Sequence, residues 1–150
     1  MDQSEINIRL MKAEDFEAVV EIDKKVLKSS RKEYYSMRFE KFFQSKDYLP
    51  ASFVAENRDG VVVGFIMGEL YMGEYGISIE EAKLDTIGVD PEYQKNGIGK
   101  LLIDEFMDHM KELEVHKINT LVGWNDSRLI NFFSANKFVP STTINLERSI

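Results

Sequence analysis

The stretch from Gln94 to Lys100, with the sequence QKNGIGK, has residue types and spacing suited to binding an anion. It follows a β-branched run that ends at Val89 and leads directly into an amphipathic segment with helical spacing. Gly97 and Gly99 carry no Cβ, so the backbone there can approach a ligand closely. A helix N-terminus adds further N–H donors and a partial positive charge. The stretch therefore predicts an anion-binding loop with two lysines at its rim.

Two established nucleotide fingerprints do not fit this loop. No Gly-Lys-Ser/Thr follows a glycine after a four-residue gap, so the loop is not a Walker motif. No Gly-x-Gly-x-x-Gly occurs in the chain, which argues against a Rossmann dinucleotide site. A plain turn between a strand and a helix is the alternative that carries no function.

Composition predicts one globular domain over residues 1–150. The chain is 43% hydrophobic and 30% charged, as in ordinary soluble proteins, and its length allows a substantial core. It has no apolar run of about 18 residues and no basic start followed by an apolar one, so we expect neither a membrane span nor a signal peptide. These features predict a cytoplasmic protein.

Cysteine, histidine and net charge exclude several classes of site. Without cysteine there is no disulfide, thiolate metal site or cysteine nucleophile, and two histidines cannot form a His-rich metal site alone. We therefore expect no metal. The net charge of −7 argues against nonspecific binding to nucleic acid. It agrees with a cationic acceptor, and equally with an acidic surface that only maintains solubility.

Hydrophobic periodicity predicts an α/β (α+β) architecture, a mixed sheet with helices on both faces. An Asp59-Gly60 pair between two apolar runs is a hairpin signal. The expected strands cover residues 6–10, 51–56, 61–71, 84–89, 118–122, 138–140 and 142–147. The expected helices cover residues 13–27, 31–44, 98–113 and 127–136.

The loop resembles the acyl-CoA motif of the GCN5-related N-acetyltransferases (GNAT), Gln/Arg-x-x-Gly-x-Gly/Ala. Here the motif reads Gln94-x-x-Gly97-x-Gly99, three residues after Val89-x-Pro91. The order of expected elements also resembles that family over the whole chain. The resemblance implies the GNAT fold, with a splayed central strand pair, and acetyl-CoA as cosubstrate.

The resemblance also implies which residues hold acetyl-CoA. Backbone amides from Lys95 to Lys100 would bind the pyrophosphate, and exposed backbone groups near Ile87 and Val89 would bind the thioester and pantetheine. Asn125 is the first candidate for a side-chain contact to pantetheine, and Asp126 the second. The implied cofactor-binding residues are Ile87, Val89, Gln94, Lys95, Asn96, Gly97, Ile98, Gly99, Lys100, Asn125 and Phe133.

The general acid is where the chain departs from the family. Many members use a tyrosine to protonate the leaving thiolate, and the matching residue here is Phe133, which has no proton to donate. Lys137 also stands where the family often has glycine. Ser134 is adjacent to Phe133 but points about 100° away on a helix. We expect Phe133 to face the sulfur end of the cofactor without donating a proton.

The general base is open. Family members that use a glutamate have it at positions occupied here by Lys83 or Leu121. The first candidate is therefore Asp85, with Glu69 second and Tyr71 third. A buried carboxylate with a purely structural hydrogen bond is the alternative for Asp85.

Strand alternation adds one expectation about Asp85. On a regular strand, residues two apart point to the same face, so Asp85 should face the same side as Ile87 and Val89. That arrangement would place the carboxylate beside the expected acyl site.

The resulting hypothesis is an acyl-CoA-dependent N-acetyltransferase that acts on a primary amine. The amine would attack acetyl-CoA directly in a ternary complex, without a covalent enzyme intermediate. The acceptor class is open between an amine-bearing small molecule and a protein or peptide, and a homodimer is also left open. The alternative hypothesis is a noncatalytic acyl-CoA-binding sensor or interaction module, supported by the phenylalanine at position 133.

Overall fold

The computed structural model describes residues 5–44, 49–70 and 81–150, and its contacts divide the chain into two compact units, 1–120 and 121–150. The second unit contains helix α4 (Ser127–Ala135). The elements of the first unit are β1 (Asn7–Leu10), η2 (Ala13–Asp15), α1 (Phe16–Leu27), α2 (Lys32–Gln44), β2 (Phe53–Glu56), β3 (Val62–Leu70), β4 (Glu81–Val89), η4 (Pro91–Tyr93), α3 (Ile98–Glu112) and β5 (Lys117–Asn119).

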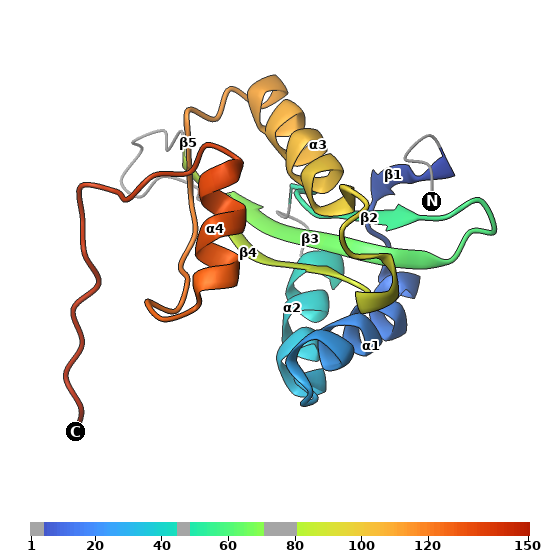
Figure 1. Cartoon of the computed structure of the whole chain (residues 1–150), viewed down its shortest axis with the longest axis horizontal. Coiled ribbons are helices and arrows are strands. Elements are labelled where there is room, and N and C mark those ends of the chain that lie inside the picture. The colour runs from blue at the N-terminus through green and yellow to red at the C-terminus, as the bar shows by residue number, and fades with distance from the viewer. Residues whose placement is uncertain (1–4, 45–48, 71–80) are drawn as a thin grey trace. The chain divides into compact units, whose positions relative to one another are not determined.

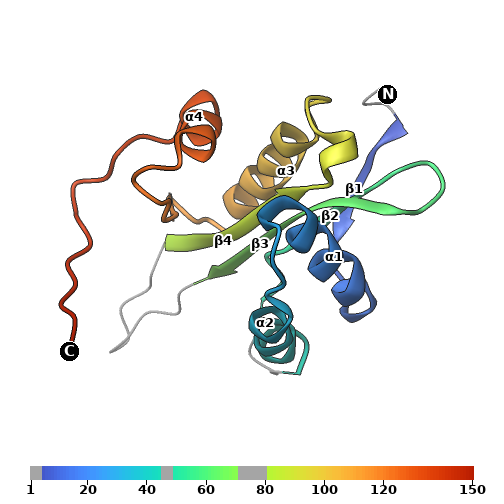
Figure 2. The same ribbon diagram turned by 60° about the horizontal axis from the view of Figure 1, so that its bottom comes forward.

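The first unit is built on a five-stranded mixed sheet in the order β1-β2-β3-β4-β5. The first four strands are antiparallel to their neighbours, and β5 runs parallel to β4. Figures 1 and 2 show α1 and α2 on one face of this sheet and α3 on the other. The predicted mixed α/β architecture with helices on both faces is therefore confirmed.

Alternation along β3 divides the core between the two faces of the sheet. Phe65 and Met67 join a buried cluster with side chains of α1 and α2. Gly64 and Gly68 flank this pair in sequence and face α3. A Cβ on Gly68 would lie 2.4 Å from the ring of Phe106, so only glycine lets the helix approach this closely.

The predicted hairpin between β2 and β3 is present, and side-chain chemistry explains its turn. The Asn57 side-chain oxygen accepts hydrogen bonds from the amides of Asp59 at 2.9 Å and Val61 at 3.0 Å. Gly60 has φ of +77°, a left-handed conformation that glycine adopts at low cost. The Asp-Gly signal in the sequence therefore located the turn correctly.

Several predicted boundaries shift; for example, the strand predicted from residue 51 begins at Phe53. The central strand begins at Glu81 rather than residue 84, and the strand predicted over 118–122 is the shorter β5. The helix predicted from residue 13 begins with the 3-10 turn η2. The exact ends of strands and helices depend on their hydrogen-bond partners, and the hydrophobic periodicity of a segment does not identify those partners.

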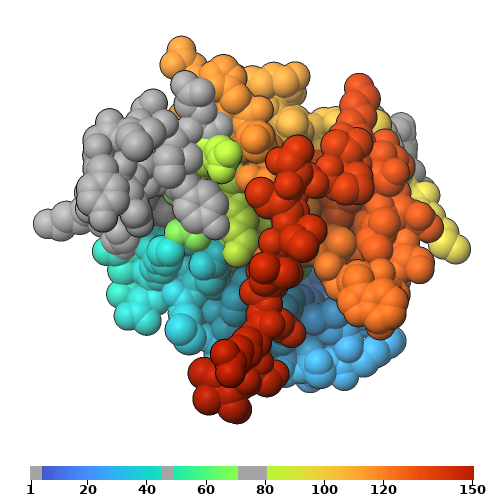
Figure 3. All heavy atoms as spheres, turned by 90° about the vertical axis from the view of Figure 1, so that its left-hand side faces the viewer, coloured from blue at the N-terminus to red at the C-terminus, as the bar shows by residue number. Residues whose placement is uncertain are grey.

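The strands predicted over 138–140 and 142–147 are wrong. Residues 138–150 form no strand in the second unit and run as an extended chain (Figures 1 and 3). Ile144 and Leu146 are each 83% exposed. The Ser141 hydroxyl accepts from the Thr143 amide at 3.2 Å and donates to the Thr143 carbonyl at 2.9 Å, and Pro140 has no N–H. Apolar alternation without a pairing partner did not produce a strand here.

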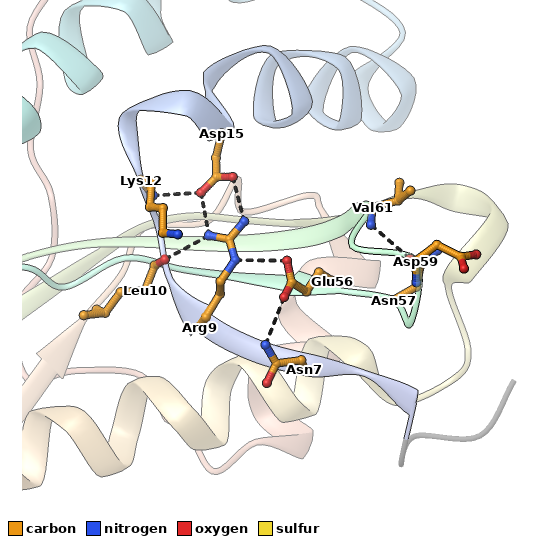
Figure 4. A network of polar contacts seen from close by, with 9 residues as sticks. All are labelled: Asn7, Arg9, Leu10, Lys12, Asp15, Glu56, Asn57, Asp59 and Val61. Atoms are coloured by element: carbon orange, nitrogen blue, oxygen red, sulfur yellow. Dashed lines mark hydrogen bonds and ion pairs between the residues drawn. The ribbon is translucent and has the colours of Figure 1, made fainter.

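A polar network joins the first strand to the elements beside it (Figure 4). The Arg9 guanidinium donates to both carboxylate oxygens of Asp15 at 2.9 Å and to Glu56 at 3.0 Å. Asp15 also accepts from the Lys12 amide at 2.7 Å, and Glu56 accepts from Asn7 at 3.0 Å. The fork of one arginine thereby connects β1, η2 and β2.

These bonds change the acid–base behaviour of the two carboxyl groups. Burial alone would raise the pKa of Asp15, but its bonds to Arg9 and to the Lys12 amide outweigh burial and lower it. The Asn7 amide and the Arg9 guanidinium lower the pKa of Glu56. Both carboxylates therefore stabilise the folded chain above the pKa of an unfolded carboxyl, and this contribution is lost as the pH falls through the lowered folded values.

We expect Arg9→Gln to lower the free energy of unfolding by about 2–3 kcal/mol at neutral pH, because it leaves the buried Asp15 carboxylate without its counter-charge. The loss should shrink below about pH 4, where the carboxyl groups take up protons. Urea unfolding from pH 7 to 3 measures both effects. The exposed Arg58, with its side chain 3.5 Å from Glu5, gives the control Arg58→Gln. A difference between wild type and Arg9→Gln that does not change with pH would contradict the assignment.

Candidate active site

A bulge interrupts the pairing of β3 with β4. Met67 pairs with Thr86, but the next residue, Gly68, pairs with Leu84, so Asp85 is an extra residue on β4. A bulge of this kind changes the direction of side chains on the strand and disturbs its alternation. Asp85 therefore does not follow the regular alternation of the strand.

The bulge overturns the expectation that Asp85 faces the same side as Ile87 and Val89. A Cβ on Gly88 would point at Phe65 and at Ile22 of α1, which places Gly88 on the face covered by α1 and α2. Ile87 and Val89, as neighbours of Gly88, point to the opposite face. Asp85 instead forms an ion pair with Arg38 of α2. Its side chain is 5% exposed.

Arg38 brings the two predicted carboxylates, Asp85 and Glu69, into one cluster. Its guanidinium contacts Asp85 and lies 3.5 Å from a carboxylate oxygen of Glu69. Lys83 lies 3.6 Å from Asp85, and Lys41 forms an ion pair with Glu69. Both carboxylates thus already face cations. Tyr71, the third candidate, lies outside the described residues.

Sequence reasoning missed Arg38, although the sequence carries a signal for it. The residue lies among the buried aromatic positions Tyr35, Phe39 and Phe42 of α2, where a charged side chain needs a partner. The Arg38 guanidinium lies 5.1 Å from the centre of the Phe42 ring. Ring contact and ion pairs together fix its direction toward the sheet.

A second buried network holds α2 against α1. Arg31 donates to both oxygens of Asp23 at 2.9 and 2.7 Å, and the Tyr35 hydroxyl donates to Asp23 at 2.8 Å. Tyr35 is fully buried and packs edge-to-face against Phe65 of β3. Burial raises the pKa of the Tyr35 hydroxyl, so it stays protonated and continues to donate. This network determines where α2 presents Arg38.

Within residues 5–44, 49–70 and 81–150, no strand pairs with one edge of β4 beyond its first three residues. The parallel pairing with β5 covers only Glu81 to Lys83, after which the Thr120 hydroxyl donates to the Leu84 carbonyl at 2.9 Å. On the other edge, the Asp90 amide donates to Val63 of β3 at 2.8 Å. Because backbone groups alternate in direction, those of Ile87 and Val89 point away from β3.

The loop after β4 closes on the strand through side-chain hydrogen bonds. The Gln94 amide group donates to the Val89 carbonyl at 3.0 Å, and Asn96 donates to the Tyr93 carbonyl at 3.2 Å. Lys95 and Gly97 have φ of +69° and +76°. These two left-handed residues turn the chain sharply into α3.

The start of α3 presents backbone donors. Gly97 is the N-cap and no side chain caps the helix, which has no acidic residue in its first turn. The first intrahelical bond of the turn runs from the Leu101 amide to the Gly97 carbonyl at 3.1 Å. The preceding amides, of Ile98, Gly99 and Lys100, therefore point out of the helix end, where they can bind an anion.

The lysine at the end of this loop is turned away from the amides. The Lys100 ammonium forms an ion pair with Asp104 one turn later, at 2.6 Å. The backbone, rather than this side chain, is thus the principal donor set of the loop.

The remaining predicted residues lie in the second unit. Asp126 caps α4 by accepting from the Leu129 amide at 3.1 Å, and Asn125 precedes it at an exposed position. Phe133 is 5% exposed and its ring packs against those of Phe132 and Phe138. A role for Asn125 or Phe133 at the cofactor stays a prediction.

In residues 5–44, 49–70 and 81–150, no group of three or more His, Cys, Asp or Glu side chains is arranged to hold a metal ion. No helix in the same ranges is long and apolar enough to cross a membrane.

The fold resembles several solved acetyltransferase structures. The aminoglycoside N-acetyltransferase AAC(6')-Iy in complex with CoA matches with a TM-score of 0.77 and 20% identity, over 96% of this chain and 94% of that one. Ard1 from Thermoplasma volcanium matches with a TM-score of 0.75 and 23% identity, over 92% of this chain and 85% of that one. The ribosomal-protein-S18-alanine N-acetyltransferase from Escherichia coli matches with a TM-score of 0.73 and 20% identity, over 91% of this chain and 79% of that one. At these identities the likeness shows the fold.

Sequence comparison identifies the family. No curated protein sequence matches this chain. The family described as "Acetyltransferase (GNAT) family" matches over residues 16–138, which is most of the chain and includes the loop and the strand that precedes it. The chain therefore belongs to the GNAT family of acyl-CoA-dependent N-acetyltransferases.

Proposed function

We propose that this protein transfers an acetyl group from acetyl-CoA to a primary amine, by direct attack within a ternary complex. We also propose that residues 1–150 act as a single domain. The observation that carries the proposal is the junction of β4 with α3. There, an edge of β4 that no strand among the described residues pairs with leads into a tight loop and a helix start without a side-chain cap. A pyrophosphate suits such outward-pointing amides.

Each part of the junction suits a different part of acetyl-CoA. The amides from Lys95 to Lys100 are the proposed pyrophosphate donors, and the turn at Gly97 lets them converge. The backbone of Ile87 and Val89 is the proposed partner of the thioester and pantetheine arm, since an edge strand presents paired donors and acceptors. From the second unit, Asn125 and Phe133 are proposed contacts.

The proposed reaction needs one proton acceptor on the amine side. The amine nitrogen attacks the thioester carbon, the carbon–sulfur bond breaks, the amine proton passes to a base, and the thiolate takes a proton. Asp85 is the proposed base and would act through water, because it lies on β4 only two residues before Ile87 while its side chain faces Arg38 of α2. Glu69 is the second candidate, in the same ion-pair cluster.

A screen of primary amines with acetyl-CoA, scored by release of free thiol, tests the function. The panel should include aminoglycosides, polyamines, amino acids and peptides with free N-termini, because similar structures are named for aminoglycoside and ribosomal-protein acetylation. Thiol release that depends on one class of amine, together with mass addition of one acetyl group to it, supports the proposal.

The second candidate is a noncatalytic acyl-CoA-binding module. Two observations favour it: Phe133 has no proton to donate, and both Asp85 and Glu69 already face cations. Tight binding of acetyl-CoA with no thiol release across the whole panel would favour this candidate over the enzyme.

We expect Gly97→Val to weaken binding of acetyl-CoA at least about ten-fold, because a β-branched residue is strained at this left-handed position and its side chain obstructs the amides. Asparagine tolerates left-handed φ, so Gly97→Asn should lose less affinity. Lys100→Ala should change affinity still less, since its ammonium pairs with Asp104. Isothermal calorimetry measures all three, with circular dichroism to verify folding. Unchanged affinity in a folded Gly97→Val protein would rule out the loop as the binding site.

We expect Asp85→Asn to bind acetyl-CoA but to turn over at least about 100-fold more slowly at neutral pH, with a deficit that shrinks at high pH, where the amine loses its proton unaided. Glu69→Gln should cost less than about ten-fold. Asp108→Asn, an exposed change of the same kind on α3, is the control for lost charge. Near-normal turnover of Asp85→Asn would remove it as the base, and a larger loss in Glu69→Gln would transfer the role there.

A further inference from the structure

A salt bridge on the face of the sheet covered by α1 joins that helix to the first residue after β4. The Lys25 ammonium lies 3.0 Å from one carboxylate oxygen of Asp90. The two residues are 65 positions apart in sequence, and neither belongs to the loop motif. The Lys25 side chain is 44% exposed, whereas that of Asp90 is 10% exposed.

Each polar group of Asp90 forms a contact just before the proposed cofactor loop, which we define as residues 94–100. Its second carboxylate oxygen accepts from the Glu92 amide at 3.0 Å, which caps η4. Its backbone amide donates to Val63 of β3, and its carbonyl accepts from Tyr93, each at 2.8 Å. Asp90 thus connects the sheet to the turn that leads into the loop.

A carboxylate with so little exposure needs a counter-charge. Burial of an unpaired carboxylate is costly, and the group moves toward water when its partner is removed. Such a movement would release the Glu92 amide and loosen η4, which ends at Tyr93, four residues before Gly97. The bond to Asp90 also raises the pKa of Lys25, so the ammonium form persists.

We propose that Lys25 is a positioning residue for the cofactor loop: it holds Asp90 in place and thereby fixes the loop for binding acetyl-CoA. The part of this inference that concerns affinity rests on the function proposed above. The part that concerns loop order in the ligand-free protein does not.

The first test is a double-mutant cycle on affinity for acetyl-CoA, measured by calorimetry. Lys25→Met should weaken binding roughly three- to ten-fold, the equivalent of about one hydrogen bond. Lys24→Met, on the same helix and exposed, is the control and should change affinity less than two-fold, as expected for a lost surface charge. Lys25→Arg should restore most of the affinity.

The Asp90→Asn background separates positioning from direct contact. Asparagine keeps an oxygen for the Glu92 amide but carries no charge that needs Lys25. In this background, Lys25→Met should have no further effect. An equal loss in both backgrounds would show that Lys25 acts on the ligand itself, and no loss in the wild-type background would also overturn the proposal.

The second test is hydrogen exchange of the ligand-free protein by mass spectrometry. Amides over residues 92–99 should exchange several-fold faster in Lys25→Met than in Lys24→Met, with β3 unchanged as the internal reference. Equal exchange in the two variants would overturn the proposal. If the wild-type protein does not bind acetyl-CoA, the proposed function fails, while the exchange result still decides whether Lys25 orders the loop.

Discussion

The strand β4 is paired along one edge, whereas no strand in the described part of the chain pairs with most of its other edge. Its register with β3 runs from Ala82 to Val89, whereas β5 pairs only with its first three residues. An interior strand with an unpaired edge is costly in a folded chain unless another group satisfies it. A ligand that bears amide groups, as pantetheine does, can supply that pairing, so the incomplete sheet is the basis of the site proposed above.

The two helices on one face each contribute a cation to a carboxylate of β4 or its end. Arg38 of α2 contacts Asp85 at the bulge, and Lys25 of α1 contacts Asp90 just after the strand. These two acids flank the stretch 86–89, in which the backbone groups of Ile87 and Val89 point away from β3. Although the chain as a whole carries a net charge of −7, the surroundings of this strand are balanced by cations from elsewhere in the sequence.

Much of the architecture was predictable because local sequence patterns determine it. The loop motif, the Asp-Gly turn and the helical periodicities depend on residues that are neighbours in sequence. The contacts that complete the site are not local. Arg38 lies 47 residues before Asp85, and no pattern around either residue names the other. The bulge at Asp85 likewise depends on the register with β3.

The tail shows the opposite failure, in which a local pattern was present but its partner was not. Ile144 and Leu146 alternate as strand residues do, yet both are exposed. Alternation of apolar and polar residues shows that one face of a segment could be buried. The segment becomes a strand only when a neighbouring strand pairs with it. Predictions from sequence alone were therefore reliable where one segment determines its own structure, as in the β2–β3 turn.

The close approach of Gly68 to Phe106 has a consequence for how this chain can diverge. A methyl group at position 68 cannot fit while the phenyl ring occupies its present place. Relatives with alanine or a larger residue at the position of Gly68 should therefore carry a smaller side chain at the position of Phe106, so that the two sites covary. Because α3 begins at the loop 94–100, a larger residue at position 68 alone would press on the helix whose first turn presents the amides.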